Sequence, residues 1–134
     1  MLIIEEITKH FNGSPVVADR FTLSTIAYGS LTQDVETYVQ MHRDVLGPWL
    51  RWPDLTIILD ISADEAMRRL GLEGGKPELF ERADKLSRIR SAYLALPEAM
   101  RQFAPTMRVV VVNGEQDKDV VFADVQRTVQ SLWA

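Results

Sequence analysis

The chain has 134 residues, 46% hydrophobic and 25% charged, which is the size and composition of one globular domain and excludes a disordered segment. Its formal net charge of -4 argues against a protein that coats DNA or RNA, which needs a basic surface. The absence of cysteine excludes disulfides and cysteine nucleophiles. No apolar run approaches the roughly 20 residues of a membrane span, so we expect neither nucleic acid nor a membrane as a partner.

The first part of the chain predicts helices around one short strand. Apolar residues at helical spacing predict a helix over residues 3–11, which the turn-forming residues 12–15 end. The apolar run that follows predicts a buried strand at 16–19. Residues 22–30 are ambiguous, with a helical turn favoured, and the apolar spacing over 32–46 predicts another helix.

The middle of the chain predicts a strand followed by a capped helix. Residues 55–61 are nearly all apolar, without alternation, which is typical of a strand covered on both faces. Ser62 and Glu65 then form a capping box, in which each side chain would bond the other residue's backbone N–H. This helix should end near Gly71, and residues 72–76 form a flexible loop.

The last part of the chain predicts helices and a third strand. Pro77 suits the first position of a helix, and Pro97 suggests that a second, short helix follows it. The run 108–112 predicts the third strand. Two sets of apolar residues are expected to face the core, namely Leu79, Phe80, Ala83, Leu86, Ile89 and Tyr93, then Val121, Phe122, Val125, Val129, Leu132 and Trp133. Strands separated by helices predict a single α/β domain over 1–134, with a three-layer parallel sheet.

Polar residues follow each predicted strand, and ligands of open α/β sheets bind beyond the carboxyl ends of the strands. Asp19 and Arg20 follow the first strand, Asp60 ends the second, and residues 113–115 follow the third. Arg20 offers a planar fork of donors suited to a phosphate, and Asp19 could orient a magnesium ion or a water. The alternative is a local Asp19–Arg20 ion pair. Three further residues could contact a sugar or a base: Ser24, Thr25 and Tyr28.

The segment 68–90 is locally basic, with seven Lys or Arg against four Asp or Glu. Its basic residues flank the glycine-containing loop 72–76, which is the layout of a mobile lid that closes over anionic oxygens. The alternative is a solvated helix face with ion pairs one turn apart, namely Glu78–Arg82 and Glu81–Lys85.

Three stretches together resemble the thymidylate kinase family. Residues 16–28 are similar to that family's strand with its Asp-Arg-aromatic motif and the Ser-Ser-x-Ala-Tyr-Gln that follows. Residues 53–69 match its second signature, and residues 80–96 are similar to the helix after its lid. The resemblance covers nearly the whole chain and implies a P-loop nucleoside-monophosphate-kinase-like fold, truncated at the N-terminus, in a cytoplasmic enzyme.

The resemblance also implies roles for individual residues in the transfer of a phosphoryl group from ATP, with Mg²⁺, to dTMP. Arg20 would hold the acceptor phosphate, and Asp19 would work beside the magnesium. The thymidine pocket would be lined by Ser24, Thr25 and Tyr28. Arg68 and Arg69 would lie in the lid region near the donor phosphates. The donor base would lie near Asn113, Gly114, Glu115 and Gln116.

Several departures from the family bear on activity. The family begins with a strand, a P-loop and a helix, and none of the 134 residues matches them; the glycines of the 71–76 stretch have the wrong spacing. The family's glutamine is Gly29 here, and its lid pattern is degraded at 76–78. In the family's sheet the missing strand lies between those expected at 16–19 and 55–61. We therefore expect either direct pairing of these strands, a P-loop-bearing partner chain, or a homo-oligomer.

Two functions follow as hypotheses. The first is the acceptor-site and lid portion of a dTMP kinase-like phosphotransferase, inactive as a lone chain because the P-loop supplies the main grip on ATP. The second is a non-catalytic nucleotide-binding or assembly module derived from a nucleotide kinase.

Overall fold

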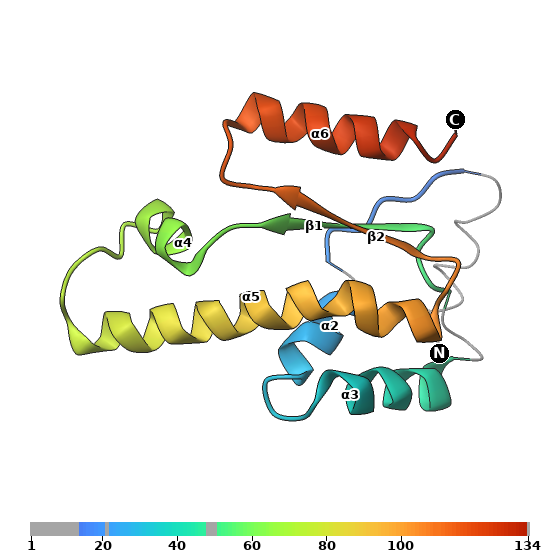
Figure 1. Cartoon of the computed structure of the whole chain (residues 1–134), viewed down its shortest axis with the longest axis horizontal. Helices are drawn as coiled ribbons and strands as arrows, with labels where there is room; N and C mark the ends of the chain where they lie inside the picture. Colours follow the sequence, from blue (N-terminus) through green and yellow to red (C-terminus); the bar gives the residue numbers. More distant parts are fainter. Residues whose placement is uncertain (1–13, 21, 48–50, 134) are drawn as a thin grey trace.

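A computed structural model describes residues 14–20, 22–47 and 51–133. The helix expected over residues 3–11 lies outside these ranges. In chain order, the elements are α2 (Thr22–Gly29), α3 (Val35–Met41), the π-helical turn η1 (His42–Leu46), β1 (Leu55–Asp60), α4 (Ala63–Arg69), α5 (Pro77–Phe103), β2 (Arg108–Asn113) and α6 (Lys118–Gln130) (Figure 1). The ambiguous residues after position 21 are therefore helical, and both later strands form as expected.

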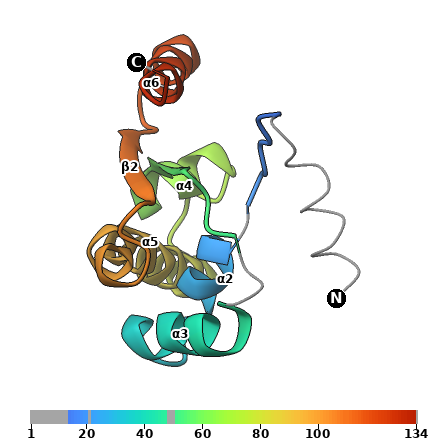
Figure 2. The ribbon, with the colours of Figure 1, turned by 90° about the vertical axis from the view of Figure 1, so that its right-hand side faces the viewer.

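The two strands form a parallel sheet. The register runs from Leu55 opposite Arg108 to Asp60 opposite Asn113, so the carboxyl ends of both strands lie at the same edge. The chain crosses from β1 to β2 through α4 and α5, as parallel pairing requires. The helices α5 and α6 lie on opposite sides of this sheet (Figure 2).

The strand expected at 16–19 is not formed, so the sheet has two strands among the described residues and not three. Residues 14–20 lie on the side of β1 that is away from β2. A strand exists only through pairing with a neighbour, and no backbone hydrogen bond joins this segment to any described residue. Its apolar side chains accordingly face solvent: Val17 is 96% exposed.

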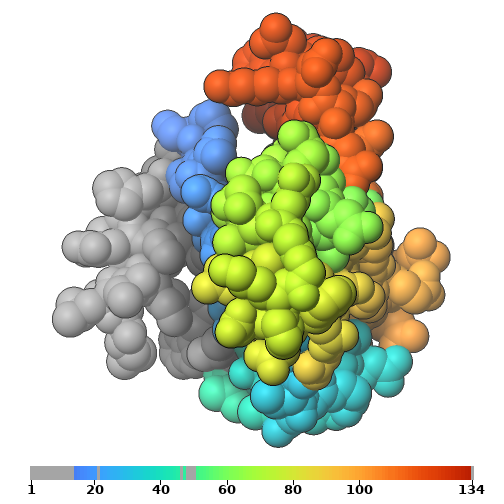
Figure 3. All heavy atoms as spheres, turned by 90° about the vertical axis from the view of Figure 1, so that its left-hand side faces the viewer, coloured from blue at the N-terminus to red at the C-terminus, as the bar shows by residue number. Residues whose placement is uncertain are grey.

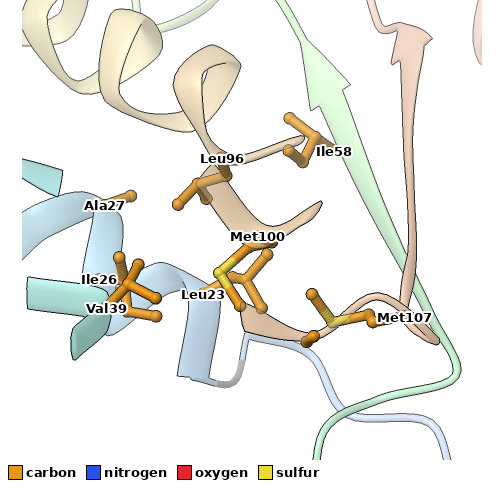
Figure 4. Packing of buried hydrophobic residues seen from close by; sticks show 9 residues of the cluster. Leu23, Ile26, Ala27, Val39, Ile58, Leu96, Met100 and Met107 are labelled. Carbon is orange, nitrogen blue, oxygen red and sulfur yellow. The ribbon is translucent and has the colours of Figure 1, made fainter. Parts of the chain in front are cut away.

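The core lies where α2, α3 and the C-terminal half of α5 meet the sheet. Ile26, Val39, Leu96 and Met100 are its largest fully buried side chains, and Ile58 reaches them from β1 (Figure 4). Residues at helical spacing on α2 supply one side of this core, because Leu23, Ile26 and Ala27 fall on one helix face.

The helix α5 is continuous from Pro77 to Phe103, with Pro97 inside it, so the separate helix expected after Pro97 is wrong. A proline in a helix removes one backbone hydrogen bond. Here Leu96 and Met100, on either side of the proline, are both buried in the core, and this packing offsets the loss. The core face predicted for the first half of α5 is wrong for Phe80, which is 67% exposed.

The last helix has no fully buried residue. Four residues of its predicted core face are partly buried, namely Val121, Val125, Val129 and Leu132, and the prediction is wrong for the other two. Phe122 and Trp133 are 64% and 69% exposed. The helix contacts β2, and the described elements leave its remaining apolar side chains uncovered. The described elements also leave β1 only partly covered on one face, since Leu59 is half exposed.

Candidate functional site

The polar residues expected at the ends of β1 and β2 meet at the carboxyl edge of the sheet. Asp60 lies opposite Asn113 in the register, and the Gly114 N–H donates to the Asp60 carbonyl at 2.8 Å. In the space-filling view of this edge, α4 and the loop after it lie in front of the strand ends (Figure 3). Two of the three predicted polar clusters are thus brought together.

Asp60 is held by an arginine that the sequence did not assign to the site. Arg90 Nε donates to Asp60 Oδ1 at 2.7 Å and Arg90 Nη2 donates to Oδ2 at 2.9 Å. These hydrogen bonds lower the pKa of the Asp60 carboxyl, against the opposing effect of burial, and raise the pKa of Arg90. The sequence counts Arg90 only among the basic residues of segment 68–90. Thirty residues separate it from Asp60, so only the three-dimensional structure could pair the two residues.

The capping box at the start of α4 is half confirmed. The Ser62 hydroxyl accepts from the Glu65 N–H at 3.2 Å, as expected. The return bond is made by a different residue, because the Ser62 N–H donates to Glu115 Oε1 at 2.8 Å. Hydrogen bonding from Ser62, first through its side chain and then through its backbone N–H, lowers the pKa of Glu115.

The two arginines of α4 are paired with Glu65. Arg68 donates to both Glu65 carboxylate oxygens at 2.8 and 2.6 Å, and Arg69 Nε donates to Oε1 at 2.7 Å. Hydrogen bonds from Arg68 and then Arg69 lower the pKa of Glu65 to about 2. Arg69 also donates to the Gly114 carbonyl at 2.9 Å, so one of the two predicted lid arginines is in direct contact with the predicted base loop.

The loop 113–116 is held by its own polar side chains. The Glu115 N–H donates to Asn113 Oδ1 at 2.9 Å. Gln116 donates to the Asn113 carbonyl and to Asp124 of α6, each at 3.0 Å. A side chain at Gly114 would come within 2.9 Å of the Ile61 methyl Cγ2, which explains why glycine occupies this buried position.

The residues predicted for the thymidine pocket lie on α2, beside α5. The Tyr93 hydroxyl donates to Ser24 Oγ at 2.8 Å, and the rings of Tyr28 and Tyr93 meet edge to face, with centroids 6.3 Å apart. Thr25 is exposed. Tyr93 therefore joins this group, although the sequence placed it only among core residues.

Asp19 and Arg20 are exposed and form no ion pair with each other or with another described residue, so the local ion pair considered from the sequence is not formed. Arg20 has a φ of 61°. Residues other than glycine adopt this left-handed backbone conformation rarely and at an energetic cost. Such conformations occur often at functional sites.

The basic lid residues are not neutralised within α5. Neither Glu78–Arg82 nor Glu81–Lys85 forms an ion pair, so the salt-bridged helix face considered as the alternative is not found. The loop 72–76 joins α4 to α5 as expected and is exposed except at Leu72.

A magnesium site at Asp19 would have few protein ligands among the described residues. Among the described residues, no group of three or more His, Cys, Asp or Glu could hold a metal ion. Mg²⁺ in phosphotransfer sites is bound by one or two carboxylates, with substrate phosphates and water completing the shell. The unpaired Asp19 carboxylate fits that limited role.

Parallel strands joined by helices, with polar groups collected at their carboxyl ends, define an α/β protein of the kind that binds small ligands at this edge. The model of the family described as thymidylate kinase matches residues 2–125. The chain belongs to the thymidylate kinase family.

Curated relatives agree with this assignment. The chain is 31% identical over 126 residues to a "Probable thymidylate kinase" of Methanococcoides burtonii, covering 90% of this chain and 58% of that protein. It is 33% identical over 121 residues to a "Thymidylate kinase" of Ruegeria pomeroyi, covering 87% and 54%. It is 25% identical over 132 residues to that of Thermosipho melanesiensis, covering 97% and 63%. The chain thus spans little more than half the length of these relatives.

Two further findings concern solved structures and membrane-spanning helices. No solved structure matches the chain significantly. In the described part of the chain, no helix combines the length and the apolar character needed to cross a membrane.

Proposed function

We propose that these residues form the acceptor site and lid of a dTMP kinase, which transfers a phosphoryl group from ATP to dTMP. The observation that carries the proposal is the family match over residues 2–125, together with the contact between Arg69 and Gly114. That contact joins the two segments that the resemblance assigns to the donor side. We further propose that residues 1–134 act as one domain of a three-layer, cytoplasmic enzyme.

On the acceptor side, Arg20 would bind the phosphate of dTMP through its planar fork of donors. Its exposure and its lack of an ion pair to a described residue leave the guanidinium available for this contact. Asp19 would contribute one carboxylate to magnesium, which supplies charge neutralisation for the transferring phosphoryl group. Ser24, Thr25 and Tyr28 would contact the nucleoside.

On the donor side, Arg68 and Arg69 would lie near the phosphates and the loop 113–116 near the base. The Arg69 side chain is 43% exposed and that of Arg68 is 61% exposed, so both can reach a ligand although they also bind Glu65. Phosphoryl transfer depends on positioned charges around the transferred group, and arginines at this edge supply them.

The 134 residues contain no GxxxxGK[ST] loop, which in P-loop kinases cradles the donor phosphates. We therefore propose that the lone chain is catalytically incomplete, and that a P-loop-bearing partner chain or segment works with it. A homo-oligomer is the other assembly that we propose. The free edge of β1 supports an added strand, because Leu55, Ile57 and Leu59 make no backbone hydrogen bond on that edge to a described residue.

A second candidate function is a nucleotide-binding or assembly module without catalysis. The exposure of Phe122 on α6 and of Trp133 just beyond its end favours it, because exposed large apolar side chains are available for contact with another chain. A module of this kind would assemble with other chains whether or not it turns over nucleotide.

A calorimetric titration tests the acceptor site. dTMP should bind more tightly than thymidine, and Arg20→Ala should weaken dTMP binding about tenfold or more while leaving thymidine binding nearly unchanged, because only dTMP carries the phosphate. Arg101→Ala, which removes an exposed arginine near the C-terminal end of α5, serves as the control. Equal losses for both ligands would contradict the phosphate role.

A coupled kinase assay tests the catalytic proposal. The lone chain should transfer negligible phosphoryl from ATP to dTMP, because the donor grip is missing. Turnover at about 1 per second or faster, within the range of ordinary kinases, would overturn this expectation.

A further inference from the structure

Glu115 reaches from the loop after β2 to the N-cap residue of α4. Its Oε1 accepts the Ser62 N–H at 2.8 Å across a sequence separation of 53 residues. Ser62 is the N-cap of α4, and its hydroxyl already accepts from Glu65. In a complete capping box the Ser62 backbone N–H would donate to the Glu65 carboxylate. Here that carboxylate is bound by Arg68 and Arg69.

A second hydrogen bond joins the same two segments at the opposite end of α4. Arg69 Nη2 donates to the carbonyl of Gly114, the neighbour of Glu115, at 2.9 Å. Ser62 is the N-cap of α4 and Arg69 is its last residue, so residues at both ends of the helix bond the loop. Two hydrogen bonds resist rotation of α4 relative to the loop, which a single one would allow.

The loop side of this connection is itself fixed. Gly114 donates to the Asp60 carbonyl at 2.8 Å and is too close to Ile61 to carry a side chain. The Glu115 N–H is held by Asn113 Oδ1 at 2.9 Å. The Glu115 backbone is therefore anchored to both strand ends, and its carboxylate is directed at α4.

We propose that Glu115 is a positioning residue, which joins α4 and the loop 113–116 into one unit and does not itself contact nucleotide. The unit would keep Arg69 beside the loop while the lid segment 72–76 changes conformation. This inference rests on the proposed function only for the identity of the bound ligand. The resemblance implies a place near the donor base for Glu115. In this proposal Glu115 instead acts on the site through its hydrogen bond to α4.

Amide hydrogen exchange of the full chain tests the proposal directly. Glu115→Ala should speed exchange at the Ser62 amide about tenfold or more, because its acceptor is lost. Glu115→Gln should restore protection, since the glutamine Oε1 can accept the same hydrogen bond. Glu81→Ala, which removes an exposed glutamate without an ion pair in the described chain, should leave Ser62 unchanged.

The pH dependence separates this role from a general contribution to stability. In the wild-type chain, protection of Ser62 should fall as the pH drops through the lowered pKa of Glu115, below 4.5. Glu115→Gln should remove that dependence. Unchanged Ser62 exchange in Glu115→Ala, or equal loosening in the Ala and Gln variants, would overturn the proposal.

Titration with Mg²⁺–ADP distinguishes this proposal from the proposed function. Weaker ADP binding in Glu115→Ala with unchanged exchange at Ser62 would identify Glu115 as a ligand contact and overturn the positioning role. Absence of ADP and dTMP binding by the wild-type chain, with Ser62 responding as expected, would refute the proposed function and support the positioning role.

Discussion

Arg90 binds both carboxylate oxygens of Asp60, at 2.7 and 2.9 Å, and thereby fastens α5 to the end of β1. The Asp60 side chain is 21% exposed and that of Arg90 is 41% exposed, so the pair is only partly shielded from water. A two-pronged pair of this geometry is stronger than an ordinary surface ion pair, but solvent screening limits its contribution.

Arg90→Lys should therefore lower the free energy of unfolding by a small but measurable amount, because lysine cannot make the parallel pair of hydrogen bonds. Urea denaturation at neutral pH measures the change. Arg101→Lys is the matched control, since the Arg101–Glu98 pair is longer, at 3.3 Å, and about three-quarters exposed. If both variants lose the same stability, the Asp60–Arg90 contact has no special role.

Local signals in the sequence were sufficient for much of the fold. The uninterrupted apolar runs predicted β1 and β2, and Ser62 predicted the start of α4. Pro77 predicted the start of α5. Each of these signals acts within a few residues, so each can be recognised without knowledge of the tertiary structure.

The errors all depend on long-range contacts. The run Val16 to Ala18 has strand composition, but a strand also needs a neighbour to pair with. Pro97 is a helix breaker by composition, yet buried residues on both sides hold the helix together. At the site, Asp60 could be predicted as a polar strand end, whereas Arg90 and the Glu115–Ser62 contact could not, because 30 and 53 residues separate these partners.

Gly114 offers a second prediction at the same edge. A Cβ at position 114 would lie 2.9 Å from Ile61 Cγ2 and 3.2 Å from the Asp60 carbonyl oxygen. Gly114→Ala should therefore cost about 1–3 kcal/mol of stability, as overpacking of a close-packed site does. At Gly75 a Cβ would meet nothing within 4 Å, so Gly75→Ala should be nearly neutral. Thermal unfolding followed by circular dichroism compares the two.

Acid stability should reflect Glu65. Its folded-state pKa of about 2 lies below the ordinary value of 4.5, so its ion pairs stabilise the fold fully above pH 4.5. This stabilisation is lost as the pH falls toward about 2, because the carboxylate is then protonated in both states. The melting temperature of Glu65→Gln should approach that of the wild type across this interval. Glu81→Gln, at an exposed glutamate without an ion pair in the described chain, is the control. A constant offset for Glu65→Gln would contradict the prediction.

Tyr93 should support α2 through its hydroxyl. Tyr93→Phe keeps the edge-to-face contact with Tyr28 but removes the hydrogen bond to Ser24 at 2.8 Å. The loss should be about 1 kcal/mol, the usual net value of one partly buried hydrogen bond. Ser24→Ala should cost a similar amount. The double variant should cost less than the sum of both, because the two residues share one interaction; strictly additive losses in urea denaturation would refute the coupling.

The free edge of β1 predicts association of the chain. Gly114 and Arg108 donate to the Asp60 and Asp54 carbonyls on one side of β1, which directs the backbone groups of Leu55, Ile57 and Leu59 to the other edge. This edge carries no charged side chain between Leu55 and Leu59, and exposed uncharged edges favour pairing with another chain.

Light scattering at micromolar concentration should therefore give a mass above the 15.2 kDa of one chain. Leu59 is 54% exposed, so Leu59→Lys can place a charge at this edge without emptying the core, and it should shift the mass toward that of the monomer. Phe80→Lys makes the same chemical change at a 67% exposed residue of α5 and should leave the assembly intact. A sharp monomer mass for the wild-type chain, with a cooperative thermal transition, would show instead that β1 is satisfied within one chain.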